Sequence, residues 1–429
     1  MAKIYPPQLV EVLKNKWEED RKKTEKVPLL PSDSFLIEFV EVAYHASFLT
    51  EEDRKIKFRV AFANENDLFN EYGYFDLIKF HEKRKFDIKE ILKLAPATNF
   101  EHTLIGITIE NNELVIWGLI NIGNSWSEYH FSRNRSAILP PNLLTISVYE
   151  PGNLEVSRFG TTILKLANGE LDSPIANCFI EGPIAEFFNE PFDQMLIEFA
   201  GELEMNLKEL SDEYNGETIS SIWGAYTGFI KCILNNIKNK KHGGSLIIID
   251  SENSEEQLQS FKIKYPCTFD LAWDVIKKAE INLYKSYKSF FSALEKDLVT
   301  INEFKMEKSH LQELEKWDKK FMDLQELFAT FSEVDGAVII DSKLNLLGFG
   351  AEIIISSDIE SVHISQNEYG KSVKEIPIES YGTRHRSVFR FCSKHKNSLG
   401  FIISQDGDVK AVTQVKEKLT LWTSIDLEN

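Results

Sequence analysis

Residues 223–251 read WGAYTGFIKCILNNIKNKKHGGSLIIIDS and predict a helix followed by a strand. Lysines and a histidine precede the glycine pair Gly243–Gly244. Cations suit the negative end of the helix dipole, and glycine favours the left-handed conformation that ends a helix, so this basic cluster has a structural explanation. The segment Ser245–Ser251 is short and apolar, which is typical of a strand buried in the middle of a sheet.

The chain downstream of this strand predicts a sheet with a helical insertion. Two long helical patterns, roughly Ala272–Asp297 and Ile301–Thr330, contain little glycine or proline and predict an antiparallel helical hairpin between strands. Strand patterns then return, with one helix after Thr383. We therefore expect a C-terminal domain over 217–429, built as a mixed sheet flanked by helices, with the hairpin at about 270–330.

The chain upstream of this domain predicts an α+β domain. Two helices, from Leu9 to Lys22 and from about Ser32 to Phe48, precede segments that alternate between apolar and polar residues. One pair of segments is joined at Asn111–Asn112 and predicts a hairpin. We expect a domain over 1–180 centred on antiparallel sheet, and a helical connection over 181–216. The expected fold class is therefore α/β together with α+β.

Composition excludes several classes of function. The 49 Lys and Arg residues against 67 Asp and Glu residues give a net charge of -18, which disfavours broad binding to nucleic acid or to anionic membranes. The 4 cysteines have no C-x-x-C spacing, so neither a disulfide framework nor a zinc site is indicated. No segment approaches the roughly 18–20 apolar residues of a membrane helix. We expect a cytoplasmic protein that binds no membrane.

Several short motifs in the last hundred residues are weak signals by themselves. Gly370–Ser372 resembles the end of a phosphate-binding loop, but Ser365 stands where that loop requires glycine. Gly348–Gly350 lies in strand-like sequence and predicts a bulge or a close backbone approach. Asp335–Ala337 ends a helix and opens a strand. Gly336 would let a ligand approach the carboxylate of Asp335, although a simple helix-stop turn is the alternative.

The segment YGTRHRSVFRF, Tyr381–Phe391, predicts a helix with basic residues in its first turn. Gly382–Thr383 resembles an N-cap. Arg384, His385 and Arg386 would meet the positive end of the helix dipole, at a cost of about 0.3–1 kcal/mol for each exposed charge. Successive helical residues are about 100° apart, so these three cannot share a face, and a phosphate chain is an economical common partner. A solvated basic turn that pairs with carboxylates is the alternative.

These pieces, in this order, resemble the bacterial diadenylate cyclase (DAC) domain. The resemblance rests on the helix and strand of 223–250, on D-G-A at 335–337, on G-T-R-H-R-S at 382–387 and on a turn that begins at Ser404. It covers about 217–429. Upstream, YPPQLVEVL, AYHASFLTEEDRKIKFRV and PPNLLTISVYEPGNLEVSR look like the sensor region (DACNV) found ahead of some DAC-like domains.

The resemblance implies a mixed α/β fold and a reaction in which two ATP molecules form cyclic di-AMP and release pyrophosphate. The active site would be shared by two copies that meet face to face, and each copy would bind one ATP or other nucleotide. Asp335 would activate the 3′-hydroxyl or bind metal. Mg²⁺ or Mn²⁺ would be the cofactor, with Asp406 as a weaker second ligand. The implied nucleotide-binding residues are Gly336, Ala337, Gly382, Thr383, Arg384, His385, Arg386 and Ser404.

Two positions depart from the family pattern. Gln405 replaces the first glutamate of an S-E-E turn, and a neutral amide is a poorer ligand for a hard divalent cation. Val334 stands where several members have histidine. An active cyclase is therefore one hypothesis, and a weakened module that binds a nucleotide as a sensor or scaffold is another. A third is an interaction protein whose hairpin, Ala272–Thr330, docks a partner.

Overall fold

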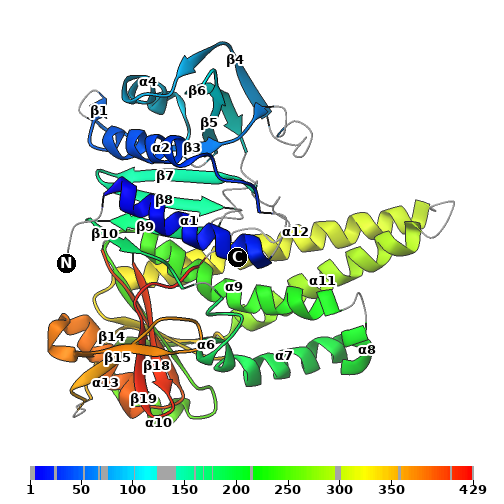
Figure 1. The fold of residues 1–429 in the computed structure, drawn as a ribbon. Coiled ribbons are helices and arrows are strands. Elements are labelled where there is room, and N and C mark those ends of the chain that lie inside the picture. Colours follow the sequence, from blue (N-terminus) through cyan, green and yellow to red (C-terminus); the bar gives the residue numbers. More distant parts are fainter. Residues whose placement is uncertain are drawn as a thin grey trace. The chain divides into compact units, whose positions relative to one another are not determined.

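The structure, a computed structural model, contains two compact units of mixed α and β structure. It describes residues 5–23, 27–51, 54–65, 68, 76–100, 102–122, 142–158, 161–167, 169–175, 177–212, 216–294, 301–355, 359–405 and 408–427. The first unit is Met1–Pro174 with Glu428–Asn429, and the second is Ile175–Leu427. The expected fold class, α/β together with α+β, is confirmed, because helices pack on mixed and antiparallel sheets (Figure 1).

The first unit is built on an 8-stranded sheet in the order β10-β9-β8-β7-β3-β5-β6-β4. Every neighbouring pair is antiparallel except β3 and β5, which are parallel. Its helices are α1 Pro6–Lys23, α2 Asp33–Ala46 and α4 Ile88–Leu94, with a short 3₁₀ turn at Ala95–Ala97. Its strands are β1 Thr50–Glu51, β2 Arg54–Lys55, β3 Phe58–Phe62, β4 Asp76–Lys85, β5 Thr103–Glu110, β6 Glu113–Asn121, β7 Leu144–Glu150, β8 Asn153–Arg158, β9 Thr161–Ala167 and β10 Glu170–Asp172.

Local sequence signals account for this unit well. The hairpin of β5 and β6 turns at Asn111 and Asn112, whose φ angles of 49° and 62° are left-handed. Asparagine tolerates this conformation better than most residues, which is why the pair marks the turn. Leu9 and Leu13 of α1 and Phe39 of α2 join Val60 of β3 in one buried cluster. The predicted helices and hairpin are therefore confirmed.

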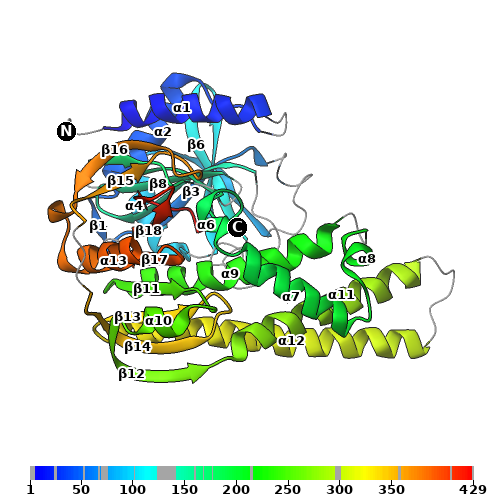
Figure 2. The same cartoon turned by 90° about the horizontal axis from the view of Figure 1, so that it is seen from below.

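The second unit is built on a 9-stranded sheet in the order β12-β14-β13-β11-β17-β18-β19-β15-β16. β11 lies between β13, which is parallel to it, and β17, which is antiparallel, so the prediction of a central buried strand is confirmed. Figure 2 shows β17, β11, β13, β14 and β12 in succession. The strands are β11 Gly244–Ile249, β12 Phe261–Phe269, β13 Ala337–Asp341, β14 Leu346–Ile353, β15 Ser361–Ser365, β16 Ser372–Pro377, β17 Ser398–Ile403, β18 Val409–Val415 and β19 Lys418–Trp422.

Helices cover both faces of this sheet. Leu246 and Ile248 of β11 belong to a buried cluster with α9, α11 and α12, whereas Ile247 and Ile249 belong to a cluster with α13. This alternation is the period of two of a strand with both faces buried. The helices are α6 Pro183–Glu186, α7 Asn189–Glu202, α8 Leu207–Asp212, α9 Glu217–Asn239, α10 Ser254–Leu258, α11 Leu271–Leu294, α12 Ile301–Thr330 and α13 Thr383–Lys394, with 3₁₀ turns η3 Phe331–Glu333 and η4 Ile378–Ser380.

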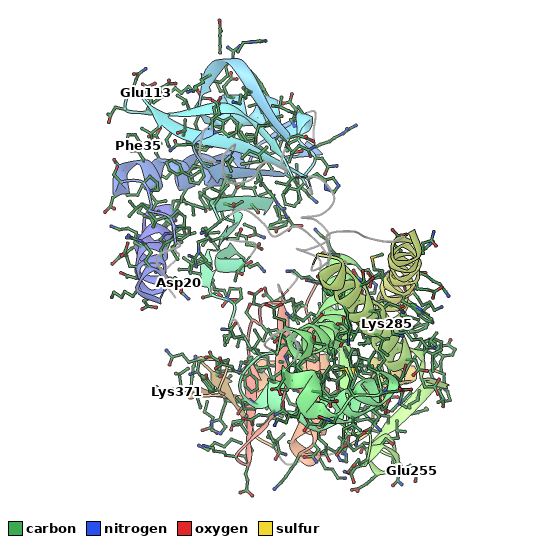
Figure 3. The ribbon with its side chains drawn as sticks, turned by 90° about the vertical axis from the view of Figure 1, so that its right-hand side faces the viewer. Asp20, Phe35, Glu113, Glu255, Lys285 and Lys371 are labelled. Carbon is green, nitrogen blue, oxygen red and sulfur yellow. The ribbon has the colours of Figure 1, made fainter. Side chains whose placement is uncertain are left out.

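The predicted helical hairpin is present between β12 and β13. α11 and α12 run side by side (Figures 1 and 2), and α12 also packs on α9. Figure 3 places Lys285 on this hairpin and Glu255 on α10. Among the described residues, none of the helices combines the length and the apolar character needed to cross a membrane.

The weak glycine motifs have structural roles. Gly348 and Gly350 lie in β14 where its register with β13 shifts, so the predicted bulge is confirmed. Gly370 lies in the turn between β15 and β16 with φ of 75°, and a strand follows it rather than a helix. Gly370–Ser372 therefore lacks the strand-to-helix setting of a phosphate-binding loop.

Candidate functional site

A cavity of about 680 Å³ lies in the second unit between the sheet and the first turns of α13. It is within the size range of small-molecule sites, about 300–1,000 Å³. Its lining includes Asp335–Ala337 and Thr383–Arg384, two segments that sequence analysis singled out separately. The fold therefore brings the D-G-A and G-T-R-H-R segments to one hollow.

The floor of the cavity is a row of paired positions across four adjacent strands, and three of the four residues are small. Ile263 of β12 pairs with Ala351 of β14, and Ala351 pairs with Ala337 of β13. Ser245 of β11 lies beside Ala337, because the next residues, Leu246 and Val338, are paired. Since directly paired residues point to the same face, their side chains form one surface. Alanine and serine keep that surface low and leave room above it.

The Asp335–Gly336 segment forms a wall of the cavity between η3 and β13. Gly336 has φ of 122°, and a Cβ atom there would lie 2.5 Å from the carbonyl carbon of Gly350. Glycine is therefore required for the close approach of this turn to β14. The Asp335 side chain is exposed and lines the cavity. The two alternatives for this tripeptide, a turn that ends a helix and a segment that a ligand can approach, thus describe the same turn.

One face of α13 closes the cavity from the other side. Thr383 and Ser387 are four residues apart, as are Arg384 and Val388, so all four lie on neighbouring positions of one helix face. Gly382 is the N-cap and offers no side chain to the first turn, which also contains no acidic residue. The backbone N–H groups of this turn and the Arg384 guanidinium therefore direct positive charge toward the cavity.

Gly382 itself lies outside the lining. Its N-cap role is the predicted one, with φ of -66° and ψ of 168°, and its carbonyl oxygen accepts the first helical hydrogen bond from the N–H of Arg386. A Cβ atom at this position would meet no atom within 4 Å. A direct nucleotide contact by Gly382 stays a prediction.

His385 is not among the residues that line the cavity, and the expectation of a cation at this position is corrected. Its ring stacks on Tyr381 at a centroid distance of 5.4 Å, and Phe389 packs edge-on at 6.1 Å. Burial, with smaller effects from the charges of Lys410 and Arg384, lowers the pKa of His385 to about 4. The imidazole is therefore neutral near pH 7. A nucleotide contact by His385 stays a prediction.

Arg386 pairs with a carboxylate at the surface, which is the alternative stated above for this basic turn. Its Nη1 atom donates a hydrogen bond to Oε2 of Glu379 at 2.9 Å, and the pair lies at the surface. The 100° step between helical residues explains why Arg384 lines the cavity and Arg386 does not. The three residues therefore do not form a common cradle in this structure, and only Arg384 meets the open volume.

The turn after β17 uses its polar groups internally. The hydroxyl of Ser404 accepts a hydrogen bond from the N–H of Asp408 at 3.0 Å, and the N–H of Ser404 donates to the carbonyl of Asp408 at 2.9 Å. Ser404 is not among the residues that line the cavity. Asp406, the predicted weaker metal ligand, lies outside the described residues. The hairpin-turn reading therefore accounts for the structure of Ser404.

Carboxylates that suit a divalent cation are few but present. In the described part of the chain, no three His, Cys, Asp or Glu residues cluster as a metal site. Asp335 lines the cavity with an exposed side chain, whereas Glu352 follows the floor residue Ala351 in β14, so its side chain points to the opposite face of the sheet. Mg²⁺ is commonly held by one or two carboxylates together with substrate phosphates, so this donor set fits a metal that arrives with a nucleotide.

Of the floor, only Ala337 was expected from the sequence, and part of the α13 wall was not expected either. Ser387 and Val388 could have been found, because they follow Thr383 and Arg384 by one helical turn. The floor residues Ile263 and Ala351 carry no local signal, since their place depends on pairing between distant strands. Sequence analysis also did not single out the flanking residues Lys262, Lys264, Glu352 and Ile353.

Comparisons with known proteins concern mainly the first unit. A family model described as probable sensor domain DACNV matches residues 25–121, which include α2 through β6. This match supports the N-terminal part of the resemblance. No curated protein matches the chain. No solved structure matches it either.

Proposed function

We propose that the second unit binds ATP in the 680 Å³ cavity and joins two ATP molecules into cyclic di-AMP, under the control of the DACNV-like first unit. One observation carries this proposal. Asp335–Ala337 and Thr383–Arg384 are distant in sequence, yet they line one cavity. They belong to two of the four pieces on which the resemblance to diadenylate cyclases rests.

The residues of the cavity suit nucleotidyl transfer. In each of the two steps, the 3′-oxygen of one ATP forms a bond to the α-phosphorus of another, pyrophosphate leaves, and the hydroxyl proton is released. Such chemistry depends on in-line positioning and on neutralising phosphate charge. Arg384 and the N–H groups of the α13 first turn would hold phosphate oxygens. Asp335, at the mouth, would orient the 3′-hydroxyl and accept its proton.

The reaction requires a second copy of the chain. A cavity of about 680 Å³ suits one nucleotide, whereas the product joins two. The 3′-hydroxyl in one copy must therefore meet the α-phosphate in another, and each copy contributes the same surface in a two-fold arrangement. We propose a face-to-face homodimer with the two cavities opposed.

Mg²⁺ or Mn²⁺ is the proposed cofactor. Asp335 would hold it together with phosphate oxygens of the nucleotide. The metal would supply positive charge that offsets the charge of the phosphates. Arg384 would share this task from the opposite wall.

The direct test is a product assay with the full chain, ATP and either Mn²⁺ or Mg²⁺. We expect cyclic di-AMP and pyrophosphate, and at least a hundredfold loss of both with Asp335→Asn, because the amide cannot accept the proton. Asp270→Asn is the matched control, since Asp270 is exposed but does not line the cavity. The proposal fails if neither product forms with either metal.

A second candidate is a nucleotide-binding module without turnover. It is favoured by Gln405, which offers a neutral amide in place of a carboxylate, and by the internal hydrogen bonds of Ser404. Calorimetry with ATP would then show binding without product. Gln405→Glu distinguishes the two candidates, because a gain of turnover would mean that this carboxylate is what the site lacks.

A further inference from the structure

The turn between α9 and β11 touches both halves of the candidate site. α9 ends at Asn239 and β11 begins at Gly244. Lys241 and Gly243 in this turn have left-handed φ angles of 60° and 68°. Sequence analysis explained the turn as a helix end. Its contacts with the two site segments go beyond that explanation.

Gly243 lies close to the guanidinium of Arg384. A Cβ atom at Gly243 would lie 2.9 Å from Nη1 of Arg384 and 2.8 Å from the carbonyl oxygen of Ile403. The Ile403 carbonyl belongs to the backbone of the central strand β17 and is held in place, whereas the arginine side chain can move. Any side chain at this position would therefore displace the guanidinium. Glycine here leaves space beside the turn for the guanidinium of Arg384.

Lys240 and Gly244 contact the segment that leads to Asp335. The Nζ of Lys240 pairs with the carboxylate of Glu333, in η3, just before Asp335. A Cβ atom at Gly244 would lie 3.2 Å from Cβ of Ser332, so the turn also packs closely on η3. The hydrogen bond from Lys240, together with its charge, lowers the pKa of the Glu333 carboxyl. The same short turn thus meets the structures on either side of the cavity.

We propose that the α9–β11 turn, Lys240–Gly244, is the positioning element of the candidate site: Gly243 seats the Arg384 guanidinium, and Lys240 fixes the Asp335 segment through Glu333. This inference rests on the proposed function. Neither Gly243 nor Lys240 lines the cavity, so each acts through another residue.

The test for Gly243 is a double-mutant cycle with Arg384, measured as the Kd for ATP by calorimetry on the full chain. We expect Arg384→Ala and Gly243→Ala each to weaken ATP binding about tenfold, the scale of one charged hydrogen bond. The double variant should lose clearly less affinity than the product of the two single losses, because the part of the Gly243→Ala effect that acts through Arg384 is already absent in Arg384→Ala. Independent effects, with a loss of about a hundredfold in the double variant, would overturn the inference.

Gly370→Ala controls for backbone strain. Gly370 also has a left-handed φ, of 75°, and a Cβ atom there would meet only side-chain carbons of Val415 and Trp422. It should lower the melting temperature and leave ATP affinity unchanged. An equal loss of ATP affinity in Gly370→Ala would assign the effect of Gly243→Ala to general strain and contradict positioning.

The Lys240–Glu333 pair provides a test that does not depend on backbone strain. Lys240→Glu places two carboxylates together and should lower the rate of cyclic di-AMP formation about two- to fivefold, the scale of a surface ion pair. ATP affinity should change less than the rate. The exchanged pair Lys240→Glu with Glu333→Lys should restore the rate, and failure to restore it would overturn this half of the inference. A wild-type chain that binds no ATP would instead refute the proposed function and the inference with it.

Discussion

The first turn of α13 and the turn between β17 and β18 both carry polar residues that match the diadenylate cyclase pattern. The two turns differ in whether these side chains face the cavity or form hydrogen bonds within the turn. The side chain of Arg384 of α13 lines the cavity and, within the described residues, makes no ion pair or hydrogen bond. The hydroxyl of Ser404 instead closes its own turn through Asp408. A polar side chain whose hydrogen bonds are made locally has little left to offer a ligand.

A residue that matches the family pattern in type is therefore not always free to contact a ligand. Arg384 and Arg386 have the same side chain two residues apart, yet one meets open volume and the other meets Glu379. His385 lies between them, is half-buried, and is neutral near pH 7. The direction of each side chain, set by the 100° step of the helix, decides which of the three can reach a phosphate.

The largest effect is expected at the wall opposite α13. Gly336→Ala would force a left-handed φ on alanine and place Cβ 2.5 Å from the backbone of Gly350. Strain and overpacking each cost about 1–3 kcal/mol, so we expect a fall in the free energy of unfolding and loss of ATP binding. Urea unfolding and calorimetry measure the two effects.

Gly224→Ala is the matched control for this substitution. Gly224 lies within α9, and a Cβ atom there would meet no atom within 4 Å. Alanine should raise stability by roughly 0.5–1 kcal/mol, as it does in helix interiors. If Gly336→Ala behaved like Gly224→Ala, the wall would not depend on glycine, and the contrast between the cavity wall and an ordinary helix position would be lost.

A smaller effect sharpens the comparison within α13. Arg384→Ala should weaken ATP binding about tenfold, because it removes a charged donor that faces the cavity. Arg386→Ala should change ATP affinity less than about twofold, since its partner Glu379 is exposed and such surface pairs contribute little. Calorimetry on the two variants measures both values. Equal losses would contradict the assignment of Arg384 alone to the cavity.

The smallest effect concerns His385 and pH. Its folded pKa of about 4 lies below its ordinary value of 6.5, so the unfolded chain binds this proton more readily. Stability from the neutral ring is therefore full above about pH 6.5 and falls as pH drops toward 4. Allowing for partial exposure, we expect about 1 kcal/mol of the stability lost between pH 7 and 5 to come from this group.

His385→Gln measures that contribution. Urea unfolding at pH 7 and pH 5 should show a smaller loss of stability in the variant than in the wild type, because glutamine does not titrate. ATP affinity between pH 6 and 8 should not follow the titration of His385, which is neutral throughout that range. The burial argument fails if the two chains lose the same stability between pH 7 and 5.

Local sequence signals account for many elements and for part of the site. The alternation of β11, the turn at Asn111–Asn112, the N-cap at Gly382 and the helical hairpin follow from side-chain periodicity and from residues with particular backbone preferences. Once Arg384 is known to line the cavity, the spacing of a helix also indicates Val388.

Sequence by itself thus determined which segments are helix or strand and which residues bear the chemistry that the resemblance implies. Only the tertiary structure decided that the cavity has one floor, formed by Ile263, Ala351, Ala337 and Ser245. It also decided that position 336 must be glycine, because the backbone of β14 leaves no room for a Cβ atom, and that Gly243 lies close to Arg384. The physical reason is that helix phase and turn conformation are local, whereas strand register and close packing join residues that are far apart in the chain, with the α11–α12 hairpin inserted between β12 and β13.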